Sequence, residues 1–180
     1  MLASLFLIGA LSTTPQMSVQ AASQSIVEEG PDGVPRAVNR MIGGIISYVR
    51  WPSAAGSGRT LCLVGTPRLT DHIAPTLPGG ETVAVRRTST AQAMARGDCD
   101  ILFLGRVPVA DRQRLVAWVR GRAIVTITDD DPTCLYGAMF CLAARPAGIG
   151  FSVNLDSVGR GTLRIDPRVL KIGQGEGSTP

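Results

Sequence analysis

Residues 123–154 read AIVTITDDDPTCLYGAMFCLAARPAGIGFSVN and contain three strand-like runs together with two cysteines. The first run, 123–128, is apolar enough for a buried strand and leads into an acidic turn that Pro132 closes. The runs at 139–144 and 150–153 are joined by a short turn with proline and glycine, which predicts an antiparallel hairpin. We therefore expect this stretch to form one edge of a sheet.

Upstream of this stretch, strand-like runs alternate with helical patterns, which favours βαβ units and a mainly parallel sheet covered on both faces. The predicted fold class is α/β: a single three-layer domain with a mainly parallel sheet, an antiparallel edge hairpin and an N-terminal amphipathic helix. The other expected elements are strands at 60–64, 83–87, 100–104 and 163–165, helices at 90–96, from Pro108 to Gly121 and after Asn154, a short helix through Leu69, Ile73 and Leu77, and a turn at 167–172.

The first helix is predicted from Pro35 to the pair Trp51-Pro52, because apolar residues recur there at helical spacing. Its opposite face carries Gly43 and Gly44, each costing about 1 kcal/mol against alanine in a helix interior. Either another segment approaches closely there, or the packed stripe alone holds the helix and the glycines are tolerated. The apolar stripe consists of Val38, Met41, Ile42, Ile45, Ile46 and Val49.

The N-terminal residues predict an exported protein. Residues 2–11 form an apolar run of signal-peptide length, too short to span a bilayer, and a cleavage site follows near Ala21 or Ala22. A membrane anchor is the alternative. The expected organisation is a signal peptide at 1–22, a flexible lead-in at 23–34, one α/β domain at 35–173 and a disordered tail at 174–180.

The charge of the chain indicates no nucleic-acid partner. The net charge is +4, and the basic residues are nearly all arginines spread along the chain without interleaved aromatic residues. A solvated basic surface explains this pattern better than nucleic-acid binding does. The predicted export of the protein is a further argument against a nucleic-acid partner.

Four cysteines in an exported chain favour disulfides over a metal site. The chain has a single histidine, His72, and no C-x2-C spacing, while the compartment is oxidising. Placement favours Cys62 with Cys99, which join neighbouring elements, and Cys134 with Cys141, which flank a turn. Two other pairings stay open at this point.

No catalytic, cofactor or metal residues are expected. No serine lies in a nucleophile-elbow motif that could use His72 as its base. The glycine-rich segments match neither of the phosphate-binding motifs G-x-G-x-x-G and G-x-x-x-x-G-K-[ST]. The acidic run 129–131 is interpreted as a turn and cap, with a cation site as the weaker alternative. A pocket without implied chemistry is expected where the parallel strands end, at residues 65–67, 86–89, 105–106 and 129–131.

Several motifs, taken in order and spacing, resemble the YfiR family of small periplasmic proteins. They are YVRWP at 48–52, LCLVG at 61–65, CDILF at 99–103, IVTITD at 124–129, Gly137, FSVNL at 151–155, Leu163 and Val169-Leu170. The resemblance covers about residues 38–172. The chain departs from the family at Gly43 and Ile45, where aromatic residues are usual.

The resemblance implies a non-enzymatic periplasmic domain with two disulfides, one of them under redox control. It implies that the protein represses an inner-membrane diguanylate cyclase by binding its periplasmic sensor region, with an outer-membrane lipoprotein as a second partner and a homodimer as a further state to test. The candidate partner-binding residues are Arg40, Gly44, Arg50 and Trp51. Two alternatives are a periplasmic small-ligand binder that uses the strand-end pocket and a redox enzyme that uses Cys134 and Cys141.

Overall fold

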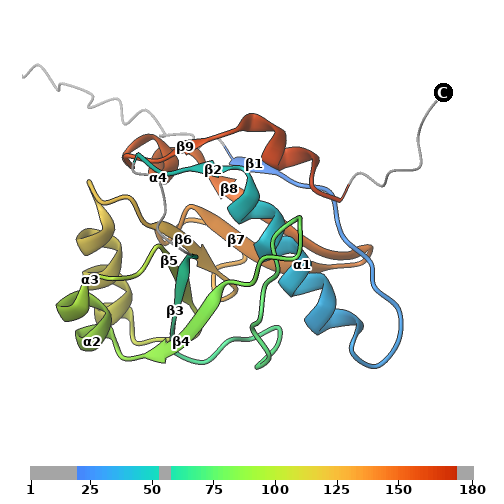
Figure 1. The fold of residues 1–180 in the computed structure, drawn as a ribbon, viewed down its shortest axis with the longest axis horizontal. Coiled ribbons are helices and arrows are strands. Elements are labelled where there is room, and N and C mark those ends of the chain that lie inside the picture. The colour runs from blue at the N-terminus through green and yellow to red at the C-terminus, as the bar shows by residue number, and fades with distance from the viewer. Residues whose placement is uncertain (1–19, 53–57, 174–180) are drawn as a thin grey trace, which may run out of the picture.

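A seven-stranded sheet forms the centre of the protein, with strand order β1-β8-β7-β6-β5-β3-β4 (Figure 1). The computed structural model describes residues 20–52 and 58–173. Strands β3 to β7 pair in parallel, and β8 pairs antiparallel with β7, so the mainly parallel sheet and its hairpin are confirmed. The strands are β1 (Gln20–Ala22), β3 (Thr60–Val64), β4 (Ala84–Thr88), β5 (Ile101–Leu104), β6 (Val125–Thr128), β7 (Phe140–Arg145) and β8 (Gly148–Asn154).

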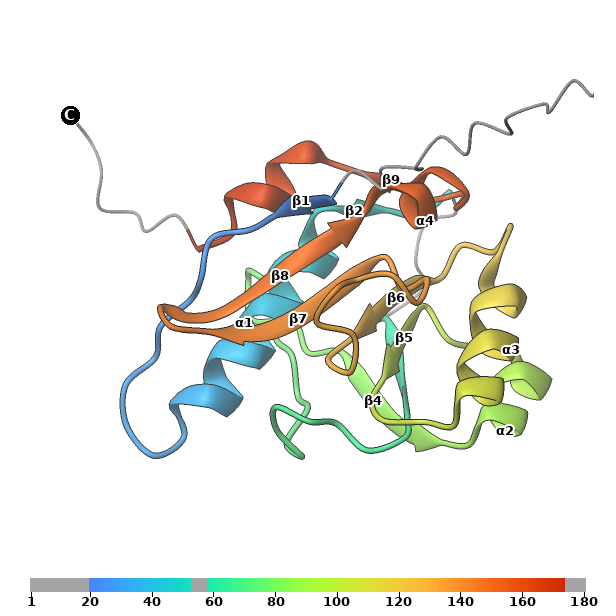
Figure 2. The same cartoon turned by 180° about the vertical axis from the view of Figure 1, so that it is seen from behind.

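Helices cover both faces of this sheet, which confirms the three layers. Along β3, Leu61 and Leu63 pack in one apolar cluster with helix α1 (Gly33–Ser47). Cys62 and Val64 point to the opposite face, because side chains alternate along a strand, and pack with α2 (Thr90–Arg96) and α3 (Val109–Val119). In both views α2 and α3 stand together, apart from α1 (Figures 1 and 2).

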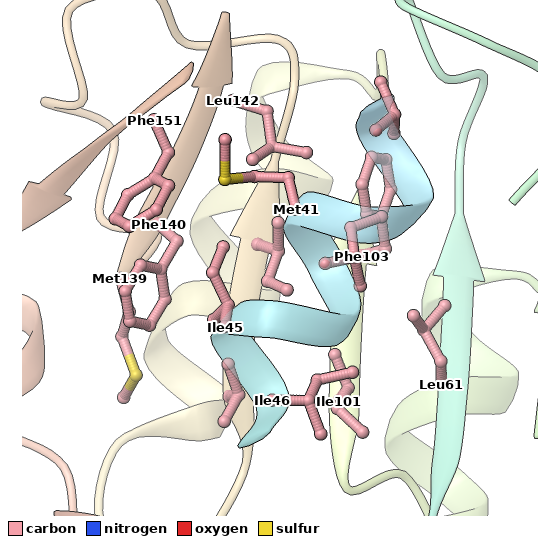
Figure 3. Packing of buried hydrophobic residues seen from close by; sticks show 14 of the residues in the cluster. Met41, Ile45, Ile46, Leu61, Ile101, Phe103, Met139, Phe140, Leu142 and Phe151 are labelled. Carbon is pink, nitrogen blue, oxygen red and sulfur yellow. The ribbon is translucent and has the colours of Figure 1, made fainter. Parts of the chain in front are cut away.

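The main core lies between α1 and the sheet. Figure 3 shows Met41, Ile45 and Ile46 of the predicted stripe among side chains from the strands. Phe140 and Phe151, from the two hairpin strands, meet edge to face with their ring centroids 5.5 Å apart. Burying this stripe is what stabilises α1, since a helix of this length is marginal in water on its own.

Helix α1 ends earlier than the sequence predicts. It stops at Ser47, and Val49 of the apolar stripe lies on a short strand, β2 (Val49–Arg50). This strand pairs antiparallel with β9 (Arg164–Ile165), and the Val49 side chain still packs in the same apolar cluster as α1. The remaining elements are α4 (Leu155–Gly159) and the 3-10 helix η1 (Pro167–Lys171).

The helix predicted through Leu69, Ile73 and Leu77 is wrong, because this segment is a loop. The Asp129 carboxylate accepts the backbone N–H groups of Arg68 (2.6 Å) and Leu69 (2.9 Å) and so fixes the start of the loop. Further along, the Asn39 side chain donates to the His72 carbonyl and accepts from the Ala74 N–H. These distant side chains take the place of helical hydrogen bonds.

The N-terminal segment is held against β8 and extends the sheet beyond the hairpin. Strand β1 pairs antiparallel with β8, Ser23 donates its N–H to the Phe151 carbonyl, and Ile26 bridges to Ile149. The lead-in predicted to be flexible over 23–34 is therefore packed at Ser23 and Ile26, and α1 already begins at Gly33. Residues 1–19 of the predicted signal peptide and the predicted tail lie outside the described residues.

Two disulfides are present, Cys62–Cys99 and Cys134–Cys141, the pairing that placement favoured. Cys62 and Cys99 pack in the cluster beneath α2 and α3, and Cys134 and Cys141 form a small cluster with Ala138. Cys141 alternates with Phe140 and Leu142 of the α1 core, so both disulfides lie on the sheet face opposite α1. Within the described ranges, no helix is long and apolar enough to cross a bilayer.

Candidate functional site

The strand ends where a pocket was predicted are occupied by the chain's own loops. Thr66 and Arg106 form an antiparallel bridge, with N–H to carbonyl distances of 3.2 and 2.7 Å. A Cβ added to Gly105 would clash with the backbone of Thr66, so these two loops pack directly on each other. A small hollow remains beside Leu104, Thr128 and Asp131, and the two larger hollows described below do not include these strand ends.

The acidic run after β6 acts as a turn, since each carboxylate binds protein groups. Burial raises the pKa of Asp129, while the N–H groups of Leu69 and Arg68 partly offset this by stabilising its charge. Asp130 pairs with Arg112 and Arg68, and Asp131 accepts the N–H of Tyr136 at 2.6 Å. The run therefore joins the loop after β3, helix α3 and the disulfide-closed segment after β6.

One grouping of metal-ligand residue types occurs in the described residues, formed by Cys62, Asp98 and Cys99. Both sulfurs are joined in a disulfide, and the Asp98 carboxylate pairs with Arg86. A metal ion needs thiolates, which a disulfide does not provide. This grouping therefore has a structural role.

A groove lies beside α1, and we call it the α1 groove. It is larger than the second hollow, which is described in a later section. It has a volume of about 1310 Å³ and lies between α1, the loop at 72–78 and the residues after η1. It is lined by Ile26, Glu28, Asp32, Pro35, Arg36, Asn39, Arg40, Gly44, Ser47, Tyr48, His72, Ala74, Thr76, Leu77, Pro78, Ile172 and Gly173.

The two glycines of α1 are explained by segments of the same chain. A Cβ on Gly43 would clash with the carbonyl oxygen of Thr76, so this glycine permits the loop to lie directly on the helix. A Cβ on Gly44 would lie 3.1 Å from Cδ1 of Ile172. Of the two explanations that the sequence left open for the glycine pair, the structure supports close approach, by the Thr76 loop and by Ile172.

The four predicted partner-binding residues do not all lie together. Arg40 and Gly44 line the α1 groove, where the Arg40 side chain is 68% exposed and forms an ion pair of 3.0 Å with Glu28. Arg50 is exposed on β2, opposite Arg164. Trp51 is half-buried, with the Arg59 guanidinium 4.1 Å from its ring centroid, and neither Arg50 nor Trp51 lines the groove.

Sequence reasoning missed Asn39, whose side chain holds the loop at 72–74 and thereby forms one wall of the groove. It also missed Ile172, which covers Gly44 from the C-terminal end of the domain. The only signal for either was the glycine pair itself, because both contacts join segments far apart in the sequence.

These features define a disulfide-stabilised α/β domain whose candidate site is an open groove with exposed charges. The sequence profile of the YfiR/HmsC-like family matches residues 36–174. The match covers most of the chain, and the protein belongs to the YfiR/HmsC-like family.

Membership of this family suggests a periplasmic regulator of cyclic-di-GMP signalling, and the family is regulatory and non-catalytic. The family and the two disulfides together suggest an exported, periplasmic protein. The family also implies an interaction with a partner in the periplasm.

Proposed function

We propose that this protein represses an inner-membrane diguanylate cyclase by binding its periplasmic sensor region, and that an outer-membrane lipoprotein relieves the block by sequestering it. Family membership supports the regulatory role. The proposal assigns the binding to the α1 side of the domain, with Arg40 and Gly44 at its centre and Arg50 and Trp51 extending it past the end of the helix.

The observation that carries this assignment is the exposed side chain of Arg40 in the α1 groove. The Arg40 side chain is 68% exposed although its guanidinium contacts Glu28, so it remains accessible to a second carboxylate. Arg36, one turn earlier, lines the same groove and has a side chain that is 50% exposed. Two accessible arginines on one helix face suit a partner surface of opposite charge, which sets orientation and association rate.

A binding measurement with charge-reversal variants tests the proposal. The purified chain is titrated with the periplasmic domain of a cyclase from the same organism, using wild type, Arg40→Glu and Arg114→Glu. Arg114 is a matched control, because it is 61% exposed on α3 and also faces an acidic residue, Asp111. We expect Arg40→Glu to weaken binding about tenfold, which corresponds to about 1.4 kcal/mol, and Arg114→Glu to leave it unchanged.

Absence of binding by the wild-type chain would contradict the proposed partner. Equal affinities for the two variants would contradict the assignment to the α1 side while leaving the partner in place. Circular dichroism of both variants establishes that neither substitution has unfolded the domain.

Export is part of the same proposal, with cleavage of a signal peptide near Ala21 or Ala22. Such a cut would remove most of β1 and would keep the contacts of Ser23 and Ile26 with β8. Mass spectrometry of the chain purified from the periplasm gives the N-terminal residue directly.

A further inference from the structure

A second hollow lies on the other side of the sheet, and we call it the α3 groove. It has a volume of about 630 Å³ and lies between α3, the segment closed by Cys134–Cys141, and α4. Its apolar lining includes Val109, Val116, Ala117, Leu135, Tyr136 and Met139. Val109, Leu135 and Tyr136 are 67%, 55% and 56% exposed, a concentration of accessible apolar surface that needs an explanation.

The walls of the α3 groove are fixed before any ligand arrives. Ser157 donates its hydroxyl to the Gly137 carbonyl at 3.0 Å, and Asn154 donates its side-chain amide to the Cys134 carbonyl at 2.9 Å. Gly137 adopts a φ of 98°, and a Cβ there would lie 2.6 Å from Val116. The disulfide-closed segment is thus tied to α4 and touches α3, so binding would require little ordering of the protein.

Positive charge dominates the α3 groove, since three arginines and one aspartate line it. Arg160 is engaged by Asp156 through two bonds of 2.8 and 2.9 Å, and Arg112 is engaged by Asp130 beneath the Tyr136 ring. Arg120 is exposed, and the described part of the chain gives its side chain no hydrogen-bonding or ion-pair partner. Its charge nevertheless reaches Asp156, whose pKa is lowered mainly by Arg160 and to a lesser degree by Arg120.

The groove is elongated along α3. Its lining runs from Val109 to Arg120, and the nine residues from Arg112 to Arg120 alone span about 12 Å along the axis of α3. The apolar residues Val116 and Ala117 lie along this length, and the unengaged Arg120 follows the last residue of α3. Arg120 and Arg160 both act on the charge of Asp156, which places the two arginines at the same end of the groove. The negative end of the helix dipole also lies near Arg120, but its effect at an exposed site is smaller than that of a charged hydrogen-bond donor.

We propose that the α3 groove binds a small amphiphilic carboxylate, such as a medium-chain fatty acid. The carboxylate would accept hydrogen bonds from Arg120, with Arg160 adding positive charge, and the chain would lie along Val116, Ala117 and Met139. The volume suits a small molecule, and an apolar pocket with a few charged groups at one end is the usual form of such a site. This inference is independent of the proposed partner, which we assign to the opposite side of the sheet.

Titration with decanoate, followed by amide chemical shifts, tests this site. We expect saturable shifts in α3, α4 and residues 134–139 of the wild-type chain. Arg120→Gln should weaken binding about tenfold, because it removes a hydrogen bond to a charged group. Ala117→Trp should abolish binding by filling the groove. Arg114→Gln, an exposed arginine of the same helix that does not line the groove, should bind as wild type does.

The neutral analogue decanol separates carboxylate recognition from simple apolar adsorption. Equal binding of decanol and decanoate would overturn the proposal, as would shifts confined to the α1 groove. The same holds if decanoate gives no saturable shifts at millimolar concentration, or binds Ala117→Trp with wild-type affinity. Thermal unfolding of each variant establishes that a loss of binding is not a loss of fold.

Discussion

The two faces of the central sheet are covered in different ways. On the α1 face, one large apolar cluster contains the three phenylalanines of the described core, Phe103, Phe140 and Phe151. On the opposite face two smaller clusters lie side by side along the sheet, and each contains a disulfide. Where little apolar surface can be buried, covalent links take over part of the stabilisation.

The two grooves differ in the same way as the two faces, since a disulfide contributes to only one of them. The α1 groove is bounded by hydrogen bonds and ion pairs, such as Asn39 with the loop at 72–74 and Arg40 with Glu28. The α3 groove is bounded by a segment that Cys134–Cys141 closes. The α3 groove thus has a covalent closure in one of its walls, whereas the walls of the α1 groove are held by non-covalent contacts.

The largest effect is expected from removing the disulfide with the longer loop. The double variant Cys62→Ser, Cys99→Ser should lower the free energy of unfolding by about 4 kcal/mol, since this bridge closes a loop of 37 residues. Urea denaturation of the oxidised proteins measures the loss. The matching variant Cys134→Ser, Cys141→Ser should lose about 2.5 kcal/mol, because its separation is only 7 residues.

If both double variants kept the wild-type stability, the α3 side would not depend on its disulfides. The claim that covalent links stabilise this face, while apolar packing stabilises the α1 face, would then be wrong. If the shorter bridge mattered more than the longer one, strain or residual structure would outweigh loop entropy.

A smaller effect is expected from the two glycines of the α1 face. Gly43→Ala should cost about 2 kcal/mol, because the added methyl group overpacks against the Thr76 carbonyl and must displace the backbone of the loop. Gly44→Ala should change stability by less than about 1 kcal/mol, since only the end of the Ile172 side chain must move and alanine is the better helix former.

Thermal unfolding of the two alanine variants, side by side, measures this difference. Gly44 serves as the control, as it is the adjacent residue in the same helix. Equal stabilities would mean that the Thr76 loop is not seated on α1.

The smallest effect is expected at acidic pH, where Asp166 at the start of η1 changes protonation. Arg168 donates hydrogen bonds to this carboxylate and lowers its pKa from 3.8 to about 2. A lowered folded-state pKa contributes stability that is present above pH 3.8 and is lost as the pH falls toward about 2. The pKa of Asp129 shifts in the opposite direction, because burial raises it.

Denaturation between pH 5 and pH 2, which brackets the expected window, compares wild type with Asp166→Asn. The variant should be less stable at pH 5 and should approach wild type as the pH falls through this window. A constant difference at every pH would mean that Asp166 does not titrate with a lowered pKa.

Much of the fold could be predicted from local patterns. The alternation of apolar runs with helical patterns predicted the parallel strands β3, β5 and β6, and the short turn near Pro146 predicted the β7–β8 hairpin. The apolar stripe of α1 predicted which residues face the core, from Val38 to Ile46. These features succeed because periodicity reports which side chains are buried.

The failures share one physical cause, which is that contacts between distant segments decide the local structure. The Asn39 side chain binds the His72 carbonyl and the Ala74 N–H, and β9 pairs with Val49 beyond the end of the helix. The glycine pair left close approach and mere tolerance both open, because the approaching segments lie far away in the sequence. The α3 groove had no local signature, because its lining comes from α3, the disulfide-closed segment and α4 together.

The central claim, repression of a diguanylate cyclase through the α1 side, is tested most directly by the cyclic-di-GMP content of cells. A strain without this protein is complemented with wild type, Arg40→Glu or Arg114→Glu, expressed at equal periplasmic levels. We expect deletion to raise cyclic-di-GMP, wild type and Arg114→Glu to restore the low level, and Arg40→Glu to leave it raised. An unchanged level on deletion, or full restoration by Arg40→Glu, would contradict this account.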